Sequence, residues 1–396
     1  MNHLKHCFIF LLCCISATYT SAQKAKIQQA IQQYNYPLAI KLIDKEKPTF
    51  ELEMQKASCL KMMNNFSSTI PLLESISSRY AANVYCLKEL ADCYLQIDNY
   101  KKANDYLQKA LSLSPENSIL LRLLGENFEQ EGKKDSAIVY YKKTIEKNPA
   151  DFVTAGKLAK LYIKKDQLDE VIDLTNQCLQ QDSLNTQMIK LNGAAYCLLH
   201  HYSKAITQLK KIEAVDSTYD TNYFLGMSYY GNNNYINAQK HLENIYKKDT
   251  ANLSVIYYLG NACTENFNSK KAIEYLNKGI FIAQKVDSVI YLYYSTLSTA
   301  YHNQEKYKEE IFALINAYKY KPTHQLILYK IASIYDLALK DEDNSKYYME
   351  LFINKVQKGV KDKYEKTGKD VDQMYLQSAK KRLNELKDKK NLAIKK

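Results

Sequence analysis

Residues 90–115 read LADCYLQIDNYKKANDYLQKALSLSP. Small and apolar residues recur three and four positions apart on both sides of Asp98-Asn99, which predicts two helices joined by a short turn. Pro115 then ends the second helix, because proline cannot continue it. A single helical hairpin cannot bury its own apolar face, so neighbouring hairpins must cover it. The stretch therefore predicts a chain built from stacked helical hairpins.

The aromatic residue of this stretch, Tyr94, recurs along the chain at steps close to 34 residues. A small residue stands three positions before most copies, and a mostly small one stands nine positions after them. The equivalent residues are Leu60, Tyr94, Phe128, Tyr162, Tyr196, Tyr229, Cys263, Tyr301 and Tyr335. The longest step, 38 residues between Cys263 and Tyr301, adds about one helical turn. We place that turn in a lengthened second helix over 270–286.

The pattern resembles that of the tetratricopeptide repeat (TPR) family, whose signature is L-G/A-x-x-Y, then Y-x-x-A, an aromatic, Ala and Pro. Further copies read LGENF and SAIVYYKKTIEKNP within 124–149, and LGMSY at 225–229. The resemblance covers nearly the whole chain after residue 22. It implies an all-α TPR solenoid, a right-handed superhelix of helix-turn-helix repeats, from an exported bacterial protein.

The same pattern divides the chain into segments. We expect a degenerate first repeat at 23–49 with YPLAIKLI as its second helix, and about nine repeats over 50–360. The last repeat carries DEDNS in place of the Y-x-x-A signal, and its second helix is expected at 344–356. The basic tail at 361–396 contains a further amphipathic helix at 371–390.

The N-terminus has the three parts of a secretory signal. Lys5 precedes an apolar run at 7–17, and Thr20-Ser21-Ala22 supplies the small residues of a cleavage site. We therefore expect a signal peptide at 1–22 and an exported protein, periplasmic or associated with the outer membrane of a Gram-negative bacterium. Two alternatives stay open: an uncleaved anchor, and a lipoprotein attached through Cys13 or Cys14.

Charge gives no support for a nucleic-acid partner. The net charge is +12, but 361–396 holds 12 Lys/Arg against 6 Asp/Glu, so half of the excess lies in the tail. The export signal also argues against nucleic acid. The helix at 371–390 carries one apolar face, formed by Val371, Tyr375, Ala379, Leu383 and Leu386. We expect it to cap the last repeat; a peripheral contact with an anionic membrane or with a partner is the alternative.

The sequence contains no motif for catalysis, a cofactor or a metal, so we expect a protein that is not an enzyme. His200-His201 is expected in a solvated turn. Glu309-Glu310 and Asp341-Glu342-Asp343 are expected on solvated helix faces. The cysteines after residue 22 form no CxxC and are expected to be small buried residues: Cys59, Cys86, Cys93, Cys178, Cys197 and Cys263.

The resemblance implies a binding groove lined by positions 2, 5, 9 and 12 of each first helix. In the last two repeats these are Leu292, Ser295, Thr299, His302, Leu326, Tyr329, Ser333 and Asp336. The candidate contacts are Tyr223, Met227, Tyr230, Tyr257, Asn261, His302 and Tyr329. Tyrosine offers a rigid contact area with one polar tip, but these rings could equally pack against neighbouring helices. No repeat pairs Lys at position 5 with Asn at position 9, so a carboxylate clamp of that kind is not expected.

We interpret the chain as a scaffold or adaptor that binds a protein or peptide segment without bond chemistry. One alternative is the sensing part of a signalling system. Another is an accessory subunit of an enzyme or transport complex of the cell envelope.

Overall fold

The computed structural model describes residues 23–80, 83–283, 287–357 and 368–394. The predicted signal peptide at 1–22 lies outside the described residues. Among those residues every regular element is a helix and none is a strand, which confirms the all-α prediction. None of their helices is both long enough and apolar enough to cross a membrane.

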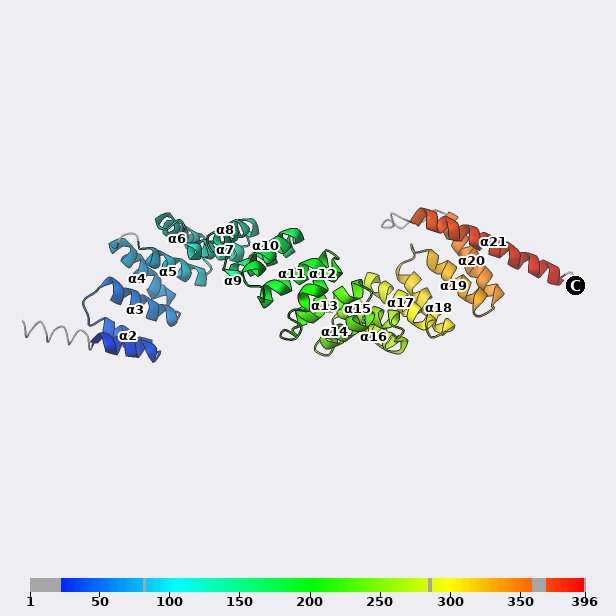
Figure 1. Cartoon of the computed structure of the whole chain (residues 1–396), viewed down its shortest axis with the longest axis horizontal. Coiled ribbons are helices and arrows are strands. Elements are labelled where there is room, and N and C mark those ends of the chain that lie inside the picture. Colours follow the sequence, from blue (N-terminus) through cyan, green and yellow to red (C-terminus); the bar gives the residue numbers. More distant parts are fainter. Residues whose placement is uncertain (1–22, 81–82, 284–286, 358–367, 395–396) are drawn as a thin grey trace, which may run out of the picture. The chain divides into compact units, whose positions relative to one another are not determined.

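Contacts divide the chain into two compact units, one up to residue 183 and one from residue 184 onward. In the first unit, residues 23–32 are helical and precede a series of labelled helices (Figure 1). These are α2 (Tyr36–Ile43), α3 (Phe50–Met62), α4 (Phe66–Arg79), α5 (Val84–Gln96), α6 (Tyr100–Leu113), α7 (Ser118–Gln130), α8 (Lys134–Lys147), α9 (Phe152–Lys164) and α10 (Leu168–Gln181).

The second unit continues the alternation of first and second helices and ends in one long helix (Figure 1). Its helices are α11 (Thr186–Leu198), α12 (Tyr202–Leu209), α13 (Tyr219–Gly231), α14 (Tyr235–Tyr246), α15 (Leu253–Glu265), α16 (Ser269–Ile282), α17 (Asp287–His302), α18 (Tyr307–Tyr320), α19 (Leu326–Leu337), α20 (Glu342–Gln357) and α21 (Gly368–Ile394).

The turn inside each helical pair has one residue in the left-handed backbone region. Asp98 has φ 56°, and Asn233 has φ 58°. The next residue then begins the second helix as its N-cap, and the side chains of Asn99 and Asn234 accept a backbone N–H there. Tyr34 takes the same conformation before Asn35, so the pair at 23–49 has the same turn as the full repeats.

Small residues on the first helix allow the second helix to approach closely. A Cβ added to Gly226 would lie 2.8 Å from the Cγ of Leu242. Tyr229, three residues later, stacks on His241 with ring centroids 5.5 Å apart. Both Tyr229 and the small residue Ala238 are buried. These contacts confirm Tyr229 as a framework aromatic of its repeat.

The extra turn in the 38-residue step lies in the first helix of the next pair. Helix α16 has 14 residues, the same length as α6, α8 and α10. Helix α17 instead has 16 residues, where α13 and α15 have 13. It begins 14 residues before Tyr301, whereas α15 begins ten before Cys263. The prediction of a lengthened second helix at 270–286 is therefore wrong.

The C-terminal helix covers the end of the last repeat, as predicted. Ala379 and Leu383 of α21 are buried in one cluster with Leu328 of α19 and Phe352 of α20. Arg382 adds two hydrogen bonds to the buried carboxylate of Asp336, at 2.8 and 2.9 Å. The second helix expected at 344–356 is also present, as α20.

We expect Gly279→Ala to destabilise the second unit. A Cβ at Gly279 would lie 1.9 Å from the buried ring of Tyr293, whose hydroxyl donates to the carbonyl of Leu253 at 2.5 Å. Overpacking of this kind costs about 1–3 kcal/mol, which outweighs the gain of up to about 1 kcal/mol that alanine brings to a helix. Urea unfolding followed by circular dichroism measures the loss. The exposed Asn277→Ala on the same helix is the control, and equal midpoints for the two variants would contradict the packing argument.

We expect Arg382→Met to loosen the capping helix. The substitution keeps much of the aliphatic stem but leaves the carboxylate of Asp336, which is 7% exposed, without its two donors. Losing charged hydrogen bonds to a buried group costs about 1–3 kcal/mol. Hydrogen exchange should become faster in α21 and at the end of α19, while α13 and α14 stay protected as the internal control. Unchanged exchange in α21 would show that apolar packing alone holds the cap.

Candidate binding site

A cavity of about 350 Å³ lies in the second unit between α17, α18, α19 and α21. Five of its lining residues occupy positions that the repeat pattern assigns to the groove: Thr299, His302, Leu326, Tyr329 and Ser333. The structure therefore brings the candidates His302 and Tyr329 together in one hollow. This hollow is the candidate binding site of the second unit.

Tyr329 is held in place from two sides. Its ring lies 5.6 Å from that of Phe352 on α20 and 5.0 Å from that of Tyr375 on α21, measured between centroids. One turn further along α19, the Ser333 hydroxyl donates to the Tyr329 carbonyl at 2.9 Å. Tyr329 thus presents a fixed aromatic surface to the cavity, with Tyr375 contributed by the capping helix.

The polar wall of the cavity contains a buried carboxyl group. Glu310 on α18 is 8% exposed, and its Oε2 lies 3.0 Å from Nδ1 of His302. Burial raises the pKa of the Glu310 carboxyl, and the neighbouring His302 opposes that shift. The side chain of His302 is 60% exposed, so the imidazole connects the buried acid to solvent. The cavity can thus offer a ligand apolar rings, hydroxyl groups and an acid–imidazole pair.

The burial of Glu310 corrects the expectation that Glu309-Glu310 forms a solvated face. Only Glu309 is exposed. Glu310 stands nine residues after Tyr301, at the position where other repeats carry a small residue such as Ala238 or Ala272. In these repeats that position faces the first helix, and Glu310 is buried there like Ala238 and Ala272. A glutamate at a position that usually holds a small residue could therefore have predicted that Glu310 is buried.

The candidates Tyr230 on α13 and Tyr257 on α15 pack edge-on against neighbouring aromatic rings. Tyr230 lies edge-on to Tyr235 and to Tyr258, with centroids 5.7 and 5.4 Å apart. Tyr257 lies edge-on to Tyr258 at 5.5 Å and to Tyr293 at 5.6 Å. Burial is the main reason that the pKa of Tyr230 rises to about 12. These half-buried rings serve the framework, and each keeps part of its surface exposed.

The remaining candidates lie on the same two helices. Tyr223 stacks on Tyr219 with centroids 6.1 Å apart, and Met227 is half-buried one turn later. The Asn261 amide donates to the Tyr257 carbonyl at 2.9 Å and accepts from the Thr296 hydroxyl at 3.1 Å. Asn261 therefore connects α15 to α17. None of these three residues lines the cavity beside His302.

The histidines at 200–201 and the cysteines that follow residue 22 lie in a turn and in the core, respectively. His200 and His201 are exposed, and His200 is the left-handed residue of its turn, as predicted for a solvated turn. Cys59, Cys86, Cys93, Cys178, Cys197 and Cys263 are buried free thiols, which agrees with the sequence expectation. Within the described part of the chain, no three metal-ligating side chains come together.

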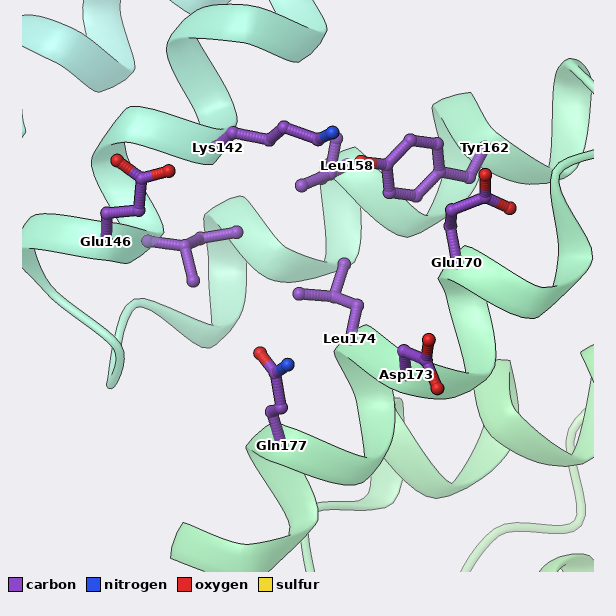
Figure 2. Close-up of a pocket in the computed structure, with 9 residues that line it drawn as sticks. Lys142, Glu146, Leu158, Tyr162, Glu170, Asp173, Leu174 and Gln177 are labelled. Carbon is purple, nitrogen blue, oxygen red and sulfur yellow. The ribbon is translucent and has the colours of Figure 1, made fainter.

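A second hollow of about 260 Å³ lies in the first unit, between α8, α9 and α10. Figure 2 shows Leu158, Tyr162 and Leu174 around its centre, with Lys142 and Glu146 on α8. Glu170, Asp173 and Gln177 complete the polar rim. The groove positions of the sequence pattern did not predict this hollow, because its polar rim comes from the second helices α8 and α10.

Comparison with known proteins finds repeat proteins of the same type. The model of the ChAPs family (Chs5p-Arf1p-binding proteins) matches residues 54–223, which is less than half of the chain. The BBSome complex member BBS4 of Bos taurus is 24% identical over 217 residues, which are 54% of this chain and 41% of that protein. The TPR repeat-containing protein MJ1428 of Methanocaldococcus jannaschii is 28% identical over 184 residues, 46% of this chain and 29% of that protein.

The chain thus spans less than half the length of each of these two relatives. Among solved structures, a tetratricopeptide repeat protein from Parabacteroides merdae has a TM-score of 0.44 at 14% identity, covering 67% of this chain and 98% of that one. The repeat period, the paired helices with their shared turn, and the capping helix define a helical-repeat solenoid. More particularly, the helix pairs recur at steps close to 34 residues, which is the architecture of a tetratricopeptide repeat solenoid.

The buried carboxyl group makes stability depend on pH in a defined direction. The pKa of Glu310 is raised above 4.5, so the folded state favours the neutral acid. Its contribution to stability is present below the ordinary carboxyl pKa and is lost as pH rises through the raised value. Glu310→Gln stays neutral and should therefore be more stable than the original chain near neutral pH, with no gain in acid. Urea midpoints measured across pH test this, with the exposed Glu309→Gln as the matched control. A lower midpoint for Glu310→Gln at neutral pH would contradict it.

Proposed function

We propose that this chain is a non-enzymatic scaffold that binds a segment of a partner protein, and that the cavity beside Tyr329 is one contact site. One observation carries the proposal. Five groove positions from two successive first helices meet around an unfilled space of about 350 Å³. A cavity of this size fits a few side chains of a peptide segment.

The composition of the cavity suits a segment with apolar and polar side chains. Leu314, Leu326 and Ile334 provide apolar walls, and Tyr329 provides a ring held by its neighbours. The hydroxyls of Thr299 and Ser333 and the exposed Lys330 lie along the same space. Fixed aromatic anchors surrounded by adaptable polar groups are typical of protein-binding surfaces.

The place of action belongs to the same proposal. We infer export to the cell envelope from the signal-like pattern of residues 1–22. In that setting a scaffold would hold envelope proteins together, and the basic helix α21 would add a peripheral contact with the membrane.

Filling the cavity tests the proposed contact. Thr299 is exposed at the cavity, so a photo-crosslinking benzoylphenylalanine there should capture a partner of discrete mass from the native envelope. Adding Ser333→Leu should reduce that adduct at least about tenfold, which corresponds to roughly 1.4 kcal/mol of binding energy. The matched control is Ser254→Leu, an exposed serine at position 2 of α15, which should leave the adduct unchanged.

Two results would overturn the proposal. The first is an adduct that survives Ser333→Leu while circular dichroism shows normal helicity. The second is the same adduct formed equally well by a crosslinker at the exposed Lys308 on α18. The double truncation Tyr223→Ala with Tyr257→Ala is a poorer test, because both rings support neighbouring helices.

A further inference from the structure

Stacked rings occur between the two helices of several repeats, and they define a template. Tyr94 stacks on Tyr106 with centroids 5.5 Å apart and an interplanar angle of 8°. Phe128 stacks on Tyr140 at 5.4 Å and 19°. In each pair the second ring comes 12 residues after the first, on the second helix. The repeat therefore has a defined place for an aromatic ring.

The hydroxyl of that second ring also has a defined partner. Tyr106 donates to Glu74 at 3.1 Å, and Tyr140 accepts from the amide of Gln108 at 2.7 Å. Both partners stand 32 residues earlier, on the second helix of the preceding repeat. The ring thus lies between two successive second helices, with its polar end bound to the earlier one.

In the repeat of Tyr162 this ring is missing. The residue 12 positions later is Leu174, and the hollow of about 260 Å³ lies beside it. The residue 32 positions before Leu174 is Lys142, which is exposed and lies on the opposite wall (Figure 2). The hollow therefore combines the apolar surroundings of the missing ring with a donor for its hydroxyl.

The second unit also has a hollow in a repeat that lacks the second ring. Twelve residues after Tyr196 stands Gln208, and a hollow of about 310 Å³ is lined by these two residues together with Ser203, Lys204 and Thr207. Two hollows thus lie where the second ring is missing, whereas Ala313, twelve residues after Tyr301, is buried without a ring. The loss of the ring leaves a hollow only where no neighbouring side chain fills the space, as beside Leu174.

We propose that the hollow beside Tyr162 binds a tyrosine side chain of a partner protein, which takes the place of the missing ring. The phenol would contact Ile145, Leu158 and Leu174, as the tyrosines of neighbouring repeats contact their own walls. Its oxygen would accept a hydrogen bond from Nζ of Lys142. That nitrogen now lies 5.7 Å from the centroid of the Tyr162 ring, on a flexible side chain that can move aside.

The charges of the rim select among aromatic groups. Glu146, Glu170 and Asp173 surround the hollow, and Lys142 is the cation among its lining residues. A neutral phenol fits this rim, whereas a phosphorylated tyrosine would meet three carboxylates with one ammonium group. The site lies in the first unit and does not depend on the cavity proposed for the second.

Small probes can test the site in the full chain. In a Gln208→Tyr chain, which fills the hollow beside Tyr196, N-acetyl-tyrosinamide should give saturation-transfer NMR signals from its ring protons at millimolar concentration. It should bind roughly threefold to tenfold more tightly than N-acetyl-phenylalaninamide, because of the one hydrogen bond to Lys142. The O-phosphorylated tyrosinamide should bind more weakly than either.

Two variants then separate the contribution of the phenol ring to probe binding from that of its hydroxyl group. Leu174→Tyr supplies the missing ring within the chain and should weaken the probe at least about tenfold, while the urea midpoint stays equal or rises. Lys142→Met is a surface change that should remove the preference for tyrosinamide and keep the binding of phenylalaninamide. Absence of probe binding, full binding after Leu174→Tyr, or an unchanged preference after Lys142→Met would each overturn the proposal.

Discussion

The fold depends on one close approach that recurs between the helices of four pairs. A large side chain of the second helix lies directly on the backbone of a small residue in the first, 16 positions earlier. A Cβ added at that small residue would collide with the large side chain, at 2.5 Å in two of these pairs, 2.6 Å in a third and 2.8 Å in the fourth. The pairs are Gly125 with Tyr141, Gly193 with Leu209, Gly226 with Leu242 and Gly260 with Leu276. This contact sets the distance between the two helices of these pairs, because the packed side chain and backbone cannot approach further.

Departures from the repeat mark the places where function can be sought. Ala238 and Ala272 show what the framework requires nine residues after the core aromatic, so the buried acid Glu310 at that position needs another explanation. Tyr106 and Tyr140 show that a ring fits where Leu174 leaves a hollow. In a repeat protein, each position can thus be compared with the equivalent positions of the other repeats. An ordinary globular domain offers no such comparison, because each of its positions occurs once.

The sequence predicted the framework well because the framework is periodic. The helix pairs, the turns at Asp98 and Asn233, the buried cysteines and the capping helix all follow from spacing and from the need to bury apolar faces. The location of the extra helical turn between Cys263 and Tyr301 could not be predicted from the spacing. A four-residue insertion preserves the helical face wherever it lies, so the pattern could not distinguish the end of α16 from the start of α17.

The sites were harder to predict than the framework, for a related reason. His302 and Tyr329 occupy groove positions and line the cavity of the second unit, but their partners Glu310 and Tyr375 come from a second helix and from the capping helix. Such contacts depend on which side chains meet across three or four helices, and a repeat pattern that treats each unit separately cannot supply them. The hollow beside Tyr162 was harder still to predict. The only trace of it in the sequence is Leu174 at a position where the repeats of Tyr94 and Phe128 carry a tyrosine.

Stacked repeats also explain how one chain can carry hollows of unrelated composition. In a solenoid each repeat contacts mainly its neighbours, so the energetic effect of a substitution stays local. Replacing a stacked ring by Leu174 weakens one interface and leaves the others intact. Burying Glu310 is likewise offset locally, by His302. Since neither change spreads through the array, separate repeats can adopt different surfaces while the packing of the other repeats is kept.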